Sequence, residues 1–301
     1  MRVFITGATG FVGSEVLRQV LAAGHIARCL VRPGSEGRLP IQKNIEVRLG
    51  DATDLESLDG SLENCDAVIH LVGIIREFPS RGITFKRLHT EATRNLLEAA
   101  ESQGVRRYVQ MSANGTRPNA ATAYHRTKWE AEQAVRDSHL DWTIFRPSLI
   151  FGPGDEFVNM LADLIRKAPL VPVFGDGRYR MAPVAVEDVA ASFVAALGCE
   201  TCVKQTYALC GPEDFSYDEI LDLVGAAIGK SRVRKLHQPL CLMQPVVHLL
   251  QGIPQFPITS NQLTMLLEGN VCDEDARRGW RETFGIEPHP FAAGIRKYLA
   301  R

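Results

Sequence analysis

The sequence predicts an α/β protein built on a doubly wound parallel sheet, with a smaller, mostly helical C-terminal subdomain. Short apolar runs typical of buried strands alternate with helical patterns over residues 1–150. The run at residues 67–72 is nearly all apolar, as expected of a strand that helices cover on both faces. Beyond residue 151 the alternation loosens, and prolines interrupt the last part of the chain.

The spacing of apolar residues along the sequence locates the individual elements, because it repeats every two residues in strands and every 3.6 residues in helices. The expected strands cover residues 3–5, 26–31, 45–49, 67–72, 107–111, 142–145, 171–174, 182–186 and 205–209. After a first helix that follows Gly13, the expected helices cover residues 84–103, 121–138, 157–167, 187–197 and 217–228. The rest, with Pro239, Pro245, Pro254 and Pro257, is expected to be irregular with short helices.

The first strand-turn-helix is the most informative stretch of the chain. Glycines recur at every third position, Gly7, Gly10 and Gly13, between an apolar strand and an amphipathic helix. A glycine in the turn lets the backbone take a positive φ, and the missing Cβ lets a pyrophosphate approach the main chain. The free N–H groups of the helix then bind the anion. The sequence therefore predicts a Rossmann-type dinucleotide site, with Gly13 allowing close packing of the helix on the strand.

The end of the second strand predicts which dinucleotide is bound. An acidic residue at this position binds the ribose 2′-OH of NAD, whereas an arginine accommodates the 2′-phosphate of NADP. This chain has Arg32 there, with Arg28 before it and Arg38 after it, and the first acid is Glu36. We therefore favour NADP(H) over NAD(H). The alternative is that Arg32 is a solvated loop residue.

Polar residues follow two further strands. Asp51, after the third strand, is suited to accept a hydrogen bond from the adenine amino group, although Asp51 or Asp54 could instead cap the next short helix. Ser112 closes the fifth strand, where its hydroxyl could bind a substrate oxygen; the alternative is that it caps a turn with Asn114.

Tyr124 and Lys128 are four residues apart on a predicted helix and so share one face. A free tyrosine has a pKa near 10. We expect the nearby ammonium to lower that pKa, which suits proton transfer to or from a substrate carbonyl or alcohol. The pair follows the fifth strand, whose carboxyl end borders the expected cofactor crevice. The alternative is an exposed tyrosine and lysine on a helix surface.

Composition narrows the range of functions. The chain has 34 Lys and Arg against 35 Asp and Glu, so no bulk charge attracts nucleic acid or an anionic membrane. Seven cysteines without framework spacing predict reduced thiols, and the lone Cys199–Cys202 pair lacks a second set of zinc ligands, so we expect no metal site. With no room for a targeting peptide and no apolar run of spanning length, we expect a cytoplasmic protein without a transmembrane segment.

Several of these motifs resemble the short-chain dehydrogenase/reductase superfamily in its extended or atypical branch. They occur in the family's order: the Thr6–Gly13 turn, Gly50-Asp51, Ser112, Tyr124-His-Arg-Thr-Lys128, Arg146-Pro147-Ser148 and Val186-Glu-Asp188-Val-Ala. The resemblance is strong over residues 1–200 and looser beyond. Within the branch it is closest to the nucleotide-binding accessory subunit of respiratory complex I and its bacterial relatives, through residues 88–95, 111–113, 257–263 and 269–271.

The resemblance implies a role for each matching position. The pyrophosphate would be held by Gly7, Thr9, Gly10, Phe11, Val12 and Gly13, the 2′-phosphate by Arg32, and the adenine by Asp51 with Ala52. Leu71, Val72 and Gly73 would line the adenine ribose, Tyr124 and Lys128 the nicotinamide ribose, and Pro147, Ser148, Leu149 and Ile150 the nicotinamide. Tyr124, Lys128 and Ser112 would be catalytic. Active members commonly add an asparagine, where this chain has His89.

These observations predict an NADP(H)-binding domain of residues 1–150, to which residues 174–209 return, and a substrate-side subdomain of residues 151–173 and 210–301. The expected function is an NADP(H)-dependent reductase or dehydrogenase of an unidentified carbonyl or alcohol substrate. The alternative is a non-catalytic NADP(H)-binding accessory, assembly or sensing protein, and a nucleotide-sugar epimerase or dehydratase is less favoured. The apolar stretch 240–253 is expected to form a wall of the substrate pocket; the other interpretation is a docking surface for a membrane or a respiratory complex.

Overall fold

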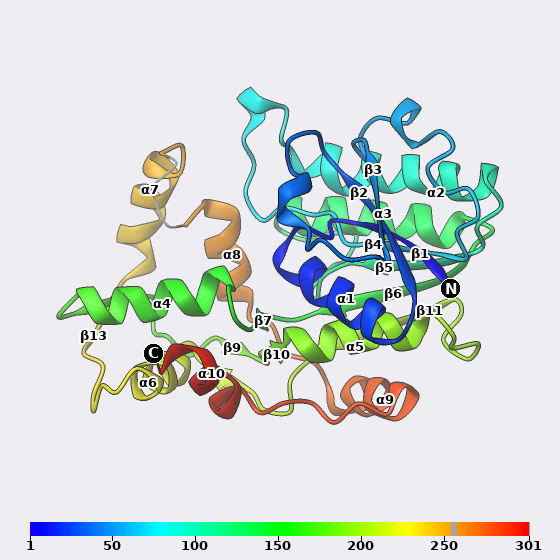
Figure 1. The fold of residues 1–301 in the computed structure, drawn as a ribbon. Coiled ribbons are helices and arrows are strands. Elements are labelled where there is room, and N and C mark those ends of the chain that lie inside the picture. Colours follow the sequence, from blue (N-terminus) through cyan, green and yellow to red (C-terminus); the bar gives the residue numbers. More distant parts are fainter. Residues whose placement is uncertain (254–257, 301) are drawn as a thin grey trace.

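A seven-stranded parallel sheet forms the centre of the molecule (Figure 1). The computed structural model describes residues 1–253 and 258–300, so that Pro254 and Pro257 lie outside the described residues. In spatial order the strands are β3 (Ile45–Leu49), β2 (Ile26–Val31), β1 (Arg2–Thr6), β4 (Ala67–His70), β5 (Arg107–Met111), β6 (Asp141–Pro147) and β11 (Gln205–Leu209). The chain thus winds outward from β1 in both directions, which confirms the predicted α/β fold class.

Helices cover both faces of this sheet (Figure 1). On one face α1 (Phe11–Ala22), α5 (Val186–Ala196) and α9 (Glu274–Phe284) bury apolar side chains against the strands. On the other face α2 (Ala92–Ser102) and α3 (Ala123–Asp137) do the same. Burial on both faces is the reason why the strands read as continuous apolar runs in the sequence.

A second hydrophobic core lies beyond the carboxyl ends of the strands. It is formed largely by α4 (Glu156–Lys167), α6 (Tyr217–Ala227) and α10 (Phe291–Leu299). Three short strand pairs frame it: β7 (Ile150–Phe151) with β10 (Val184–Ala185), β9 (Arg180–Met181) with β12 (Phe215–Ser216), and β8 (Val171–Phe174) with β13 (Lys235–Gln238). Two further helices, α7 (Leu240–Leu250) and α8 (Ser260–Glu268), pack on each other beside it.

Two of the expected elements differ in the structure, and the short strands β7, β9, β12 and β13 were not predicted. The expected helix at 84–103 consists of a π-helical turn, Lys86–Glu91, followed by α2. The wider turn lets His89 and Thr90 reach Thr127 of α3, which is long-range packing that local periodicity does not encode. The expected strand at 182–186 is only β10, which pairs with β7 outside the main sheet.

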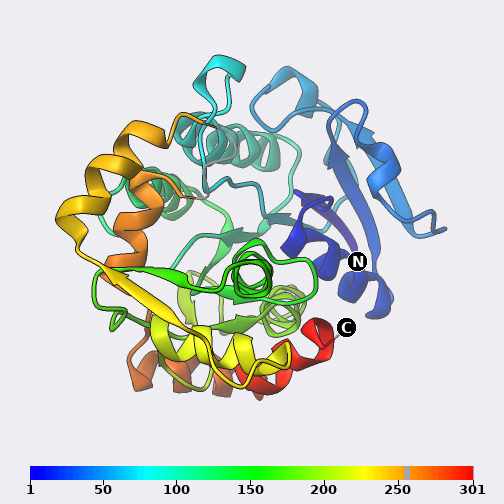
Figure 2. The same ribbon diagram turned by 90° about the vertical axis from the view of Figure 1, so that its left-hand side faces the viewer.

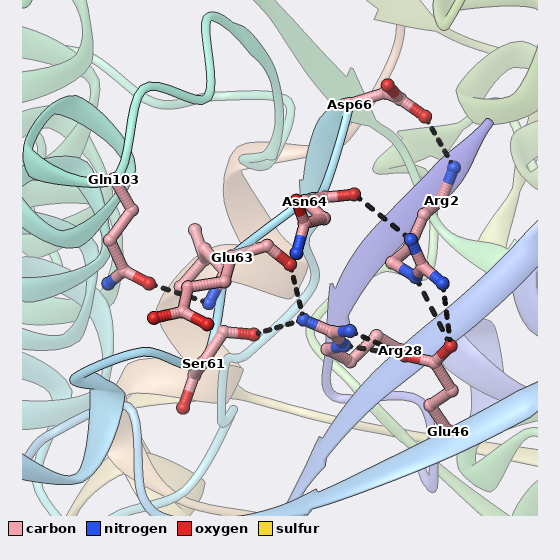
Figure 3. A network of polar contacts seen from close by, with 9 residues as sticks. Arg2, Arg28, Glu46, Ser61, Glu63, Asn64, Asp66 and Gln103 are labelled. Atoms are coloured by element: carbon pink, nitrogen blue, oxygen red, sulfur yellow. Dashed lines mark hydrogen bonds and ion pairs between the residues drawn. The ribbon is translucent and has the colours of Figure 1, made fainter.

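A polar network closes the amino ends of the first three strands (Figure 3). The Glu46 carboxylate accepts hydrogen bonds from both Arg2 and Arg28, at 2.7–3.2 Å. Arg28 also donates to the carbonyl oxygens of Ser61 and Glu63. Because Arg28 is only 8% exposed and its guanidinium is engaged in these hydrogen bonds, Arg28 is a structural residue of the sheet.

Cys210 and Cys272 form a disulfide across 62 residues of sequence. Cys210 follows β11 directly, and Cys272 lies in the loop between α8 and α9. The expectation that all seven cysteines are reduced thiols is therefore wrong for this pair. The spacing gave no signal because only the tertiary fold brings the end of the sheet and the α8–α9 loop together.

Candidate functional site

Helix α1 begins without a side-chain cap. Gly10 is its N-cap residue and supplies no side chain, and the first turn carries no acidic residue. Among the residues that the structure describes, no acceptor takes the N–H groups of Phe11, Val12 or Gly13. These amides and the positive end of the helix dipole point at the carboxyl edge of the sheet, and they fit the diphosphate of a dinucleotide.

The glycines before α1 create the space for that anion. Gly7 has a φ of +80° and receives the Gly10 N–H on its carbonyl at 3.0 Å, which closes the turn that holds Ala8 and Thr9. A Cβ on Gly13 would lie 1.9 Å from the Gly7 carbonyl oxygen. Gly13 is therefore the position where the helix rests directly on the glycine turn.

The residues expected around the adenosine half lie at the ends of neighbouring strands. Arg32 follows β2, is exposed, and forms no ion pair within the described part of the chain. The Asp51 carboxylate accepts hydrogen bonds from the backbone N–H and the hydroxyl of Thr53, both at 2.9 Å. The next short 3₁₀ turn, Glu56–Leu58, begins after Leu55, so neither Asp51 nor Asp54 caps it.

The loop after β4 approaches helix α3 closely. A Cβ on Gly73 would lie 3.0 Å from Lys128 Nζ. In the same loop Leu71 is buried, while Val72 is half-buried and Gly73 is exposed. Nearby, Ala52 is held by a hydrogen bond that Asn95 of α2 donates to its carbonyl oxygen. A Cβ on Gly7 would lie 3.1 Å from the Leu71 carbonyl carbon, so residues 71–73 lie between the glycine turn and Lys128.

Lys128 is almost completely buried, with 3% of its surface exposed. Its ammonium donates a hydrogen bond to the carbonyl oxygen of Met111, at the end of β5, at 3.1 Å. Burial lowers the pKa of Lys128 to about 8, although the Glu132 carboxylate acts in the opposite direction. The ammonium is thus still protonated in most molecules at neutral pH.

Tyr124 lies one turn before Lys128 on α3, within an aromatic cluster. Its ring makes edge contacts with those of Phe85, His89 and His125, at centroid distances of 5.7, 5.3 and 5.2 Å. Burial raises the pKa of Tyr124 to about 12. The expectation that the ammonium of Lys128 lowers this pKa is therefore wrong for this structure, because desolvation by the surrounding rings dominates.

The Ser112 side chain points toward the buried side of α3. Its hydroxyl donates to the Glu132 carboxylate at 2.5 Å, and Glu132 is fully buried. Glu132 also accepts two hydrogen bonds from Arg146, at 2.8 and 2.6 Å, and pairs with Arg136 at 2.9 Å. Asn114 does not share a turn with Ser112; its side chain donates to the Asn270 side chain. The sequence analysis missed Glu132, although it lies one helical turn after Lys128 on α3.

Two neutral histidines lie beneath the site. His70, fully buried at the end of β4, is 2.6 Å from the Thr6 hydroxyl through Nδ1, and its Nε2 has no partner in the described chain. Burial lowers its pKa to about 3. His89 contacts the Thr127 hydroxyl at 3.0 Å and the Ile74 backbone at 3.2 Å, and burial also lowers its pKa well below the usual value. His89 thus joins the loop after β4 to α3.

The segment after β6 leads from the sheet into the second core. Pro147 and Ser148 are buried, and the Ser148 hydroxyl donates to the Ala182 carbonyl oxygen. Leu149 and Ile150 are half-buried, and Ile150 begins β7. The segment therefore lies between the two cores.

The Cys199–Cys202 pair shows no metal site. The Cys202 sulfur receives a hydrogen bond from the buried Arg107, and both thiols are free. Within the part of the chain that the structure describes, no three metal-ligating side chains converge. In residues 1–253 and 258–300, no helix has the length and apolar character needed to cross a bilayer.

Together, the doubly wound sheet, the glycine turn and the open end of α1 define a Rossmann-type nucleotide-binding protein. The chain belongs to the NAD dependent epimerase/dehydratase family, whose model matches residues 3–208. This confirms the resemblance to extended short-chain dehydrogenases/reductases, since the relatives include complex I subunits and bacterial reductases.

Three similar proteins illustrate the range of this family. The chain is 30% identical to the mitochondrial NADH dehydrogenase [ubiquinone] 1 alpha subcomplex subunit 9 of Arabidopsis thaliana, over 90% of this chain and 69% of that protein. It is 31% identical to the ceramide reductase of Caulobacter vibrioides, over 79% and 74%. The fold matches that of Thermus thermophilus UDP-glucose 4-epimerase, solved with NAD, at a TM-score of 0.75 and 20% identity, over 99% of this chain and 98% of that chain.

Proposed function

We propose that this protein is an NADP(H)-dependent reductase or dehydrogenase that acts on a carbonyl or alcohol. The observation that carries the proposal is the position of Tyr124 and Lys128 on one face of α3. Lys128 Nζ lies against Gly73 and the end of β5, at the sheet edge where α1 presents its free amides. A proton donor, a buried ammonium and an anion site at one edge suit hydride transfer with a nicotinamide dinucleotide.

In this proposal each part of the cofactor has its own residues. The amides of the glycine turn and of α1 bind the diphosphate, and the exposed Arg32 binds the 2′-phosphate. Asp51 with Ala52 faces the adenine. The riboses and the nicotinamide are lined by Leu71, Val72 and Gly73, by Tyr124 and Lys128, and by the segment Pro147, Ser148, Leu149 and Ile150.

NADPH, when bound, supplies the hydride for the substrate carbon. Tyr124 then donates its hydroxyl proton to the substrate oxygen, which favours the reductive direction because burial keeps the phenol protonated at neutral pH. Lys128, one turn away, keeps its ammonium charged at pH 7 and holds the nicotinamide ribose in this scheme. Ser112 reaches a substrate oxygen in this scheme only if it exchanges its hydrogen bond to Glu132.

A second function is favoured by specific contacts. The Ser112 hydroxyl is already engaged, and His89 stands where active members commonly have an asparagine. The similarity to a complex I subunit points in the same direction. The alternative is therefore an NADP(H)-binding accessory protein without turnover, associated with a respiratory complex.

One experiment separates the two functions. Purified protein is mixed with NADPH and a panel of aldehydes and ketones, and NADPH oxidation is followed by absorbance for the wild type, for Tyr124→Phe and for the control Tyr207→Phe in β11. We expect oxidation by the wild type and the control, and its loss in Tyr124→Phe with NADPH binding retained. Tight NADPH binding without oxidation by any form would favour the accessory function.

The cofactor preference has a separate test. Arg32→Asp is compared with the wild type for binding of NADPH and NADH by fluorescence titration. We expect the preference to shift from NADPH toward NADH, because the aspartate repels the 2′-phosphate and accepts from the ribose 2′-OH. An unchanged ratio of dissociation constants would contradict the role proposed for Arg32.

A further inference from the structure

Helix α7 (Leu240–Leu250) carries apolar side chains on two opposite faces. One face packs on α8 and includes Val247, which is completely buried. The other presents Leu242, Val246 and Leu249, whose exposed fractions are 65%, 42% and 81%. Their spacing of four and three residues aligns them in one stripe. Apolar residues on both the buried and the exposed face of a helix are typical of a position where another molecule covers the exposed face.

The stretch of sequence around the start of this helix contains basic residues and no acidic ones. Residues 223–267 contain no Asp or Glu. Four cationic residues lie in that stretch: Lys230, Arg232, Arg234 and Lys235. Lys235 is paired with an aspartate of α6, at 2.7 Å. The other three are exposed and form no ion pair with any residue that the structure describes, so their charges face solvent uncompensated.

The basic residues and the apolar stripe belong to one edge of the molecule. The four-residue strand β13 (Lys235–Gln238) connects them directly, and α7 begins two residues after it. In the turned view, β13 in yellow runs toward α7 in gold at the outer edge of the molecule (Figure 2). Leu236 within the strand is itself 45% exposed.

We propose that α7 and the basic residues before it form a docking surface for an anionic lipid membrane. The stripe of Leu242, Val246 and Leu249 enters the boundary between headgroups and acyl chains, and Lys230 with the neighbouring arginines binds lipid phosphates. This combination of an in-plane apolar face and adjacent cations is how peripheral proteins bind membranes without spanning them.

The chemistry of the stripe favours lipid over a protein partner. Interfaces between proteins are anchored by Trp, Tyr and Arg side chains. None of the exposed residues of α7 is such an anchor; they are Cys241, Leu242, Gln244, Pro245, Val246, His248 and Leu249. A second copy of the chain docked through α7 about a two-fold axis would also bring two uncompensated basic segments toward each other.

The docking surface lies beside the loop that leads to the candidate site. Arg76 Nη2 donates hydrogen bonds to the carbonyl oxygens of Gln251 and Ile253, just after α7, at 2.7 and 2.8 Å. Arg76 follows Gly73, which contacts Lys128, by three residues. A membrane bound at α7 therefore lies next to the substrate side of the site. The proposal itself does not depend on whether the protein catalyses a reaction.

Flotation of the full-length protein with vesicles tests the proposal. Vesicles of phosphatidylcholine alone are compared with vesicles that also contain phosphatidylglycerol, at low and high salt. We expect binding to the anionic vesicles at low salt, and weaker binding at high salt because salt screens the cations. Both Leu249→Asp and the double variant Arg232→Glu/Arg234→Glu should weaken this binding about tenfold or more.

Matched controls separate local from general effects. Ile41→Asp changes an exposed apolar residue elsewhere, and Lys43→Glu/Arg48→Glu gives the same change in net charge on the far edge of the sheet. Both should bind vesicles like the wild type. The proposal is overturned if the wild type does not bind the anionic vesicles, or if Leu249→Asp binds them as well as the wild type does. It is also overturned if sedimentation shows a dimer that Leu249→Asp dissociates and neither protein binds vesicles.

Discussion

Gly13 and Gly279 offer a direct test of how α1 is seated. Both are helical glycines without a positive φ, so helix propensity alone predicts that alanine stabilises each by about 0.5–1 kcal/mol. A Cβ at Gly279 would meet nothing within 4 Å. A Cβ at Gly13 would lie 1.9 Å from the Gly7 carbonyl oxygen and 2.8 Å from Ala8 Cα, which are backbone atoms that cannot rotate away.

The structure therefore predicts that Gly13→Ala lowers the free energy of unfolding, whereas Gly279→Ala raises it. Contacts under 3.0 Å essentially never occur for a real Cβ, so in Gly13→Ala the start of α1 must move by about 1 Å. Overpacking of this kind costs about 1–3 kcal/mol, and the rigid partner places Gly13→Ala toward the upper end. We expect a net loss of about 2 kcal/mol, or about 3 °C in melting temperature for a chain of 301 residues.

Thermal and urea unfolding followed by circular dichroism measure both variants, and NADPH titration measures the site. Gly279→Ala should be as stable as the wild type or more so, with unchanged NADPH binding. Gly13→Ala should be less stable and bind NADPH more weakly, because the amides of the first turn move. A Gly13→Ala protein as stable as the wild type would refute the packing argument.

Four further predictions follow from buried groups. The pKa of His70 is about 3 in the fold against about 6.5 in the unfolded chain. The unfolded state therefore takes up the proton first, and the free energy of unfolding falls as pH drops from about 6.5 toward 3. His70→Gln should shrink the difference in the free energy of unfolding between pH values of about 6.5 and 4.5 by up to about 2.3 kcal/mol in urea titrations, and an unchanged difference would show that His70 does not titrate as described. The Lys128 ammonium loses its proton near pH 8, so the dissociation constant of NADPH should rise by up to about tenfold per pH unit above that value in the wild type; an equal rise in Lys128→Met would assign it to another group. Reduction of the Cys210–Cys272 disulfide should lower the free energy of unfolding by about 4 kcal/mol, since the bond closes a loop of 62 residues, and Cys272→Ser should not respond to dithiothreitol. Glu132→Gln should cost about 1–3 kcal/mol, because it removes the buried carboxylate that is the counter-charge of the half-buried Arg136 and Arg146; a loss well below about 1 kcal/mol in urea unfolding would argue against a tight network.

The features predicted correctly from the sequence are those that a short run of neighbouring residues determines. The glycine turn and the strands at 26–31, 45–49 and 107–111 are each defined by neighbouring residues, and the structure has them at these positions. Gly13 was expected to allow close packing of helix and strand, and the structure leaves no room for a Cβ at this position, against the backbone of the turn that follows β1.

What the sequence could not show depends on residues far apart in the chain. The hydrogen bond from Ser112 to Glu132 spans 20 residues, and the π-helical turn at His89 depends on Thr127. The raised pKa of Tyr124 has the same origin, because rings from another segment displace the water that would stabilise the phenolate.

The position of β11 has a consequence for how the chain folds during synthesis. β6 is complete at Pro147, yet the strand that pairs with its outer side is made only at residues 205–209. Until those residues leave the ribosome, the nascent sheet ends in a row of unpaired amide and carbonyl groups that another chain could pair with. A truncation near residue 150 would make that transient state permanent, so the nucleotide-binding half should be produced with its returning strand rather than cut at the apparent boundary.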